Sequence, residues 1–98
     1  MIKRIVKMVF RADATDAFLH IFDNGCEAIR ASEGCSYLEL VRDSKDPRIF
    51  FTISVWDDEA ALGAYRKSDL FKRTWAATKV LFDDAPEAWS TDSHRRLE

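Results

Sequence analysis

The sequence has few cysteines, histidines, prolines and glycines, and it lacks long apolar runs. Its 98 residues include 2 Cys, 2 His, 2 Pro and 3 Gly, and no apolar stretch approaches the roughly 20 residues of a membrane span. Cys26 and Cys35 are too far apart for a Cys-x-x-Cys pair, so we expect two free thiols. His20 and His94 have no second ligand at helical spacing, which argues against a zinc site. These scarcities predict a chain without a disulfide, a metal or a membrane span.

Neither sign of charge dominates the chain. Lys plus Arg number 15 and Asp plus Glu 17, for a net charge of −2, so nothing favours binding to nucleic acid or to an acidic membrane surface. Residues 1–10 interleave basic and apolar side chains and lack the apolar core of a signal peptide. We expect one cytoplasmic domain over residues 1–91. A C-terminal tail over 92–98 follows, in which Leu97 and Glu98 match a dipeptide that cloning vectors add.

Apolar periodicity predicts strands and helices along the chain. Period-2 alternation predicts strands over residues 1–11, 35–42 and 49–56, and a short last strand over 87–91. Helical stripes run from Phe18 to Ile29, from Asp57 to Tyr65 and from Leu70 to Phe82. This order is that of a ferredoxin-like split βαβ unit, so we predict an α+β fold with an antiparallel sheet.

Residue types at the segment ends predict where two of the helices begin and one ends. Asp13 or Thr15 can cap the first helix, and Ser68 or Asp69 can cap the third. Pro86 is expected to close the third helix, because proline cannot continue the hydrogen-bond ladder.

The predicted strands are apolar on both faces. We expect the helices to cover the face that carries Val6, Met8, Phe10, Leu38, Leu40, Phe51, Ile53 and Val55. The other face would then hold Ile5, Val9, Tyr37, Val41, Phe50 and Trp56, interrupted by Lys7, Glu39, Thr52 and Ser54. An apolar patch of this size predicts a homodimer formed by packing two such faces together, and Asp in place of Phe50 or Tyr37 should split or unfold it. An ordinary amphipathic sheet with a few exposed apolar residues is the alternative.

Five segments carry a family resemblance. They are the opening strand over 1–11, the turn over 31–35, the strand end over 51–56, the acidic helix start over 57–62, and the segment over 65–71. In these segments the chain resembles the antibiotic biosynthesis monooxygenase-like proteins, and the resemblance extends over nearly the whole chain. It implies a dimeric α+β barrel. Members of this family include cofactor-free oxygenases that act on phenols and quinols, and haem-degrading enzymes.

The haem-degrading branch uses an Asn on strand one, a Trp on helix two and a His on helix three. The positions of this chain that match on the helices are Tyr65 and Trp75, and the only Asn is Asn24 on the first helix. Without the His, the iron ligation of that branch does not carry over, so we expect no haem and no other cofactor.

The oxygenase branch needs only an apolar pocket and a few polar groups, because a deprotonated aromatic substrate can itself reduce oxygen. The resemblance then implies that Phe22, Phe51, Trp56 and Trp75 bind a small aromatic substrate. Tyr65 would be the catalytic residue, orienting the substrate oxygen or accepting its proton through water. Aromatic side chains on helical stripes are also typical of an ordinary core. A non-catalytic small-molecule-binding dimer or a structural dimer of the same fold therefore remains the alternative.

Overall fold

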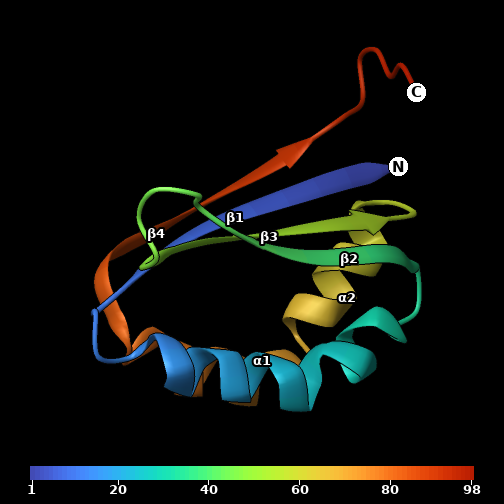
Figure 1. Cartoon of the computed structure of the whole chain (residues 1–98). Helices are drawn as coiled ribbons and strands as arrows, with labels where there is room; N and C mark the ends of the chain where they lie inside the picture. Colours follow the sequence, from blue (N-terminus) through green and yellow to red (C-terminus); the bar gives the residue numbers. More distant parts are fainter.

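The computed structural model describes residues 1–98 and shows one antiparallel sheet with all helices on one side (Figure 1). The elements are β1 (Ile2–Phe10), α1 (Thr15–Arg30), β2 (Cys35–Arg42), β3 (Ile49–Trp56), α2 (Glu59–Arg66), α3 (Asp69–Lys79) and β4 (Phe82–Thr91). The four strands lie in the order β2-β3-β1-β4, and every neighbouring pair is antiparallel. The predicted ferredoxin-like α+β fold is confirmed. No helix is both long and apolar enough to cross a bilayer.

The main core lies between β1, β3 and α1. Met8, Phe10, Phe18 and Phe50 are its buried members. The rings of Phe10 and Phe18 stack with centroids 4.2 Å apart, and Phe50 meets Phe18 at 5.2 Å. Each such ring contributes roughly 1.5–3 kcal/mol on burial, so these contacts hold α1 against the sheet.

Strand β3 presents a different face to the helices from the one predicted. Phe50 pairs with Met8, and paired residues of antiparallel strands point to the same face. Phe50 and Trp56, which are 2% and 1% exposed, therefore lie under the helices. Phe51 and Ile53 lie on the opposite face, so the predicted assignment of these residues was wrong.

Ser54 and Val55 also lie on the faces opposite to those predicted. Ser54 lies on the helix side and is buried, and its hydroxyl accepts a hydrogen bond from Trp56 Nε1 at 2.9 Å. The periodicity of β3 favoured the wrong face, because Thr52 and Ser54 interrupt the face that the helices cover and the opposite face is wholly apolar. The pairing with β1 decides which face they cover.

One face of the sheet carries no helix, and we call it the open face. The strand register places these residues on it: Lys3, Ile5, Lys7, Val9, Tyr37, Glu39, Val41, Ile49, Phe51, Ile53, Val55, Asp84, Glu87, Trp89 and Thr91. Tyr37 and Trp89 are 45% and 44% exposed. The Tyr37 hydroxyl donates a hydrogen bond to Glu39 Oε1 at 2.6 Å. The open face is thus more apolar than predicted. Strand β3 contributes three aliphatic residues and a phenylalanine to it, in place of the predicted Phe50, Thr52, Ser54 and Trp56.

The helix starts agree only in part with the predicted caps. Ser68 accepts a hydrogen bond from Phe71 N at 3.1 Å, so its predicted capping of α3 is confirmed. The residue that caps α1 is Ala14, without a side-chain hydrogen bond, so the prediction of Asp13 or Thr15 was wrong.

The third helix ends earlier than predicted, and the last strand is longer. Helix α3 stops at Lys79, and β4 already begins at Phe82. Phe82 extended the helical stripe in the sequence because it packs on the same aromatic core, 5.3 Å from Phe10. Pro86 lies inside β4 rather than closing α3. The sheet tolerates it because β4 is an edge strand and the register shifts beside it, between Lys7 and Val9.

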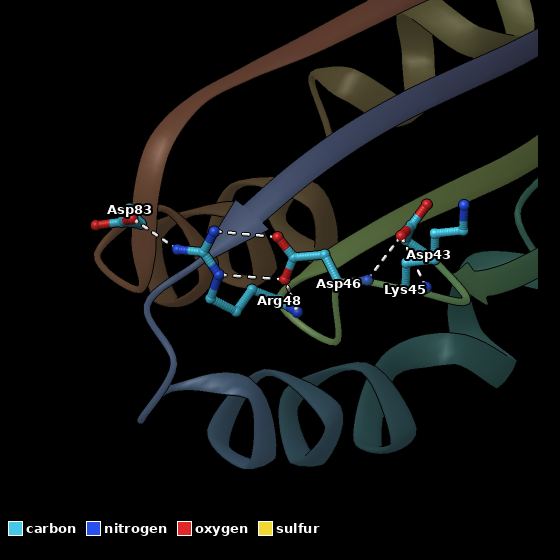
Figure 2. A network of polar contacts seen from close by, with 5 residues as sticks. All are labelled: Asp43, Lys45, Asp46, Arg48 and Asp83. Atoms are coloured by element: carbon cyan, nitrogen blue, oxygen red, sulfur yellow. Dashed lines mark hydrogen bonds and ion pairs between the residues drawn. The ribbon is translucent and has the colours of Figure 1, made fainter.

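The turn between β2 and β3 is held by a charged network (Figure 2). Arg48 bonds to both carboxylate oxygens of Asp46, at 3.2 and 3.1 Å, and to Asp83 of β4 at 3.2 Å. Asp43 accepts hydrogen bonds from the backbone N–H groups of Lys45 and Asp46. The bonds from Arg48 lower the pKa of Asp46. The network is only half-buried, so it orients the turn more than it stabilises the fold.

Candidate functional site

A cavity lies between the sheet and the three helices, with a volume of about 280 Å³. This is close to the lower end, about 300 Å³, of the usual range for small-molecule sites. Its wall is mostly apolar, and every helix and every strand contributes to it. The cavity is therefore large enough for a small aromatic compound.

The structure brings four of the five predicted site residues to this cavity. Phe22 comes from α1, Trp56 from β3, Tyr65 from α2 and Trp75 from α3. Phe51 does not reach it, because its side chain lies on the open face, beside those of its strand partners Lys7 and Val41. The predicted role of Phe51 in binding a substrate in this cavity was wrong, for the same reason that the β3 face was wrong.

The aromatic wall continues from the sheet through two helices. Tyr65 stacks on Trp56 at 4.9 Å and meets the edge of Phe71 at 5.3 Å. Phe71 lies parallel to Trp75 at 5.9 Å, with an interplanar angle of 9°. The prediction of the site did not include Phe71. Its position one helical turn before Trp75 was the available signal.

The two cavity tryptophans differ in what they can offer a ligand. Trp56 is fully buried, and its indole N–H is already used by Ser54. It presents only ring surface. Trp75 is half-buried and contacts the rings of Phe71 and Phe82, and its indole N–H makes no hydrogen bond within the protein. Its indole N–H is therefore the one available for a hydrogen bond to a ligand.

Tyr65, the predicted catalytic residue, lines the cavity. Burial raises the pKa of its hydroxyl to about 12, and the nearby Cys35 adds to the effect. At neutral pH the hydroxyl therefore keeps its proton and acts as a hydrogen-bond donor. Of the two roles predicted, orientation of a substrate oxygen fits this state better than acceptance of a proton.

Two arginines also line the cavity, and neither was among the predicted site residues. Arg4 comes from β1 and Arg66 from α2. The position of Arg4 could have been predicted from the alternation of the strand. Arg4 is two residues before Val6 and four before Met8, so all three side chains lie on the helix-covered face. Arg66 follows Tyr65 directly and is exposed to solvent.

The remaining candidate groups lie elsewhere. His20 is exposed, does not line the cavity and lies 3.1 Å from Asn24 Nδ2. Cys26 and Cys35 are free thiols. No group of three or more His, Cys, Asp or Glu side chains could hold a metal ion. The wall of the cavity contains no carboxylate and no histidine.

The family comparison matches most of the chain. The family model described as antibiotic biosynthesis monooxygenase matches residues 1–77. No curated protein sequence matches the chain significantly. The assignment therefore depends on the family model and on solved structures.

Solved structures share the whole fold. A crystal structure described as an antibiotic biosynthesis monooxygenase is 25% identical, with a TM-score of 0.91 over 97% of this chain and 100% of that chain. A conserved protein from Methanosarcina mazei is 21% identical, with a TM-score of 0.88 over 92% and 89% of the two chains. A protein from Mycobacterium tuberculosis is 18% identical, with a TM-score of 0.89 over 99% and 98%. The last two similarities show the fold alone.

The raised pKa of Tyr65 predicts a measurable pH dependence. In the folded protein Tyr65 should ionise near pH 12, whereas the unfolded chain ionises near its ordinary value of 10.0. Folding therefore favours the protonated hydroxyl. This contribution to stability is complete below about pH 10 and is lost as the pH rises toward 12. Tyrosinate absorbance of the native protein minus that of Tyr65→Phe isolates this group from Tyr37. A native midpoint near 10 for Tyr65 would contradict its burial at the cavity wall.

Proposed function

Since the chain belongs to the antibiotic biosynthesis monooxygenase family, we propose that it is a cofactor-independent monooxygenase acting on a small phenol- or quinol-type aromatic compound. The observation that supports this most is the cavity, whose aromatic wall carries one phenolic hydroxyl, that of Tyr65. Planar rings fit between flat aromatic side chains, and a phenolic oxygen pairs with a hydroxyl donor.

The proposed reaction needs molecular oxygen as its only oxidant. An anthrone-type substrate loses a proton, and its anion transfers an electron to oxygen. Recombination gives a peroxide, and loss of water leaves a carbonyl group. One oxygen atom enters the substrate and the other leaves as water.

Each residue then has a defined role. Tyr65 donates a hydrogen bond to the substrate oxygen, which stabilises the negative charge that develops there. Phe71 and Trp75 stack on the ring and exclude water. The buried Trp56 forms the floor of the cavity. No side chain of the wall is a general base, so the substrate proton goes to water.

The missing base also favours a second candidate function. A cavity without a carboxylate or a histidine suits a protein that binds an aromatic compound without transforming it. A structural dimer of this fold would need no occupied cavity at all. Ligand binding without oxygen uptake would support the binding protein.

Oxygen uptake with a panel of anthrones and hydroquinones, without added cofactor, tests the proposed chemistry. We expect turnover by the wild type and a loss of about 10- to 100-fold in kcat for Tyr65→Phe, the effect of removing one hydrogen bond to a charged oxygen. Trp75→Ala should weaken binding as well. Tyr37→Phe is the matched control, because it removes a hydroxyl on the open face, and it should retain activity.

Equal rates in the wild type, Tyr65→Phe and Trp75→Ala would remove both residues from the chemistry. A loss in Tyr37→Phe as large as that in Tyr65→Phe would show that the effect is not specific to the cavity.

We also propose that the protein is a homodimer formed through the open face. Phe51, Ile53 and Ile5 lie near the centre of this face and have no helix over them. Contiguous apolar surface of this kind is rare on a monomer. A second copy of the same face covers it by two-fold symmetry.

Sedimentation at micromolar concentration should give about twice the 11.3 kDa chain mass. Phe51→Asp or Tyr37→Asp should give folded monomers, because the carboxylate would be buried unpaired at the interface. Phe50→Asp should unfold the chain instead, since Phe50 belongs to the core under α1. A wild type that sediments as a monomer would contradict the proposed assembly.

A further inference from the structure

The two cavity arginines have no acidic partner. The four ion pairs of the structure involve Arg11, Arg48 and Arg96, and neither Arg4 nor Arg66 takes part in one. Arg4 Nη1 donates a hydrogen bond to the neutral Ser90 Oγ at 2.9 Å. A half-buried guanidinium without a carboxylate is unusual, because the loss of hydration is not balanced by an opposite charge.

The two guanidinium groups also act on each other. Burial lowers the pKa of Arg4, and the positive charge of Arg66 lowers it further. The only opposing influence is Glu59, and it is weaker than Arg66. Two like charges at one cavity create a positive potential that a bound anion relieves.

A ligand can reach this pair from the β4 edge. Ser90 and Ala88 of β4 pair with Arg4 and Val6 of β1, so their side chains lie on the helix side of the sheet. Both residues are nevertheless exposed, because the helices do not cover this edge. Their small side chains leave the arginine end of the cavity open to solvent.

We propose that the ligand of this cavity is an aromatic carboxylate, whose anionic group lies between Arg4 and Arg66. Its ring packs against Tyr65, Phe71 and Trp75. Guanidinium groups bind carboxylates through two parallel hydrogen bonds, which fixes the orientation of the ring as well as its charge. The inference names the substrate class of the proposed oxygenase, and it rests on the same cavity.

Binding of two probes of the same shape tests this inference. 2-Naphthoate carries the carboxylate, and 2-naphthamide is its neutral counterpart. We expect the wild type to bind naphthoate at least about tenfold more tightly. Arg4→Gln and Arg66→Gln should each lose about tenfold in naphthoate affinity and keep the affinity for naphthamide. Retained naphthamide binding shows that a variant is folded, and Arg66, which is exposed, can be replaced even if Arg4 cannot.

Arg73→Gln is the matched control. It removes one positive charge from α3, where Arg73 bonds to the backbone oxygen of Asp69 and does not line the cavity. Its affinity for naphthoate should match that of the wild type. An equal loss in Arg73→Gln would overturn the inference, because long-range charge alone would explain the effect. Equal binding of both probes to the wild type would also overturn it, while leaving the aromatic cavity intact. Failure to bind either probe would contradict the proposed function itself.

Discussion

Strand β3 is apolar on both faces, and the helices can cover only one of them. This constraint shapes the rest of the molecule. Pairing with β1 turns Phe50 and Trp56 toward the helices, where Phe50 anchors the core and Trp56 becomes the floor of the cavity. The same pairing turns Phe51 and Ile53 outward, onto a face that no helix covers. The cavity and the proposed dimer interface are therefore the two sides of one strand.

The cavity combines a flat aromatic wall with polar groups that are all hydrogen-bond donors or neutral hydroxyls. Tyr65 is protonated at neutral pH, and burial raises its pKa further above that range. The two arginines supply positive charge. No group of the wall can accept a proton from a substrate at neutral pH as a carboxylate or a histidine would. This composition suits a ligand that brings its own negative charge and, for an oxygenase, a substrate that ionises readily.

The sequence predicted the order of elements well, because each strand and helix has a clear period and polar turns separate them. It predicted the wrong face of β3 for the helices, since large apolar side chains lie on both faces and only the pairing of Phe50 with Met8 decides. The end of α3 was misplaced because Phe82 contacts the same core from a strand. Arg4 was missed because a charged residue in a strand is ordinarily assigned to the solvent side. Four of the five predicted site residues reach the cavity, and the fifth, Phe51, follows the error in β3.

The three tryptophans offer a direct test of where an aromatic ligand binds. Trp56 and Trp75 line the cavity, whereas Trp89 lies on the open face. Their indole N–H resonances can be assigned with Trp→Phe variants and followed by NMR during a titration with 2-naphthoate. Binding in the cavity should shift the Trp75 resonance most, shift that of Trp56 as well, and leave that of Trp89 in place. A shift confined to Trp89, or no shift at any of the three, would contradict a ligand site between the helices and the sheet.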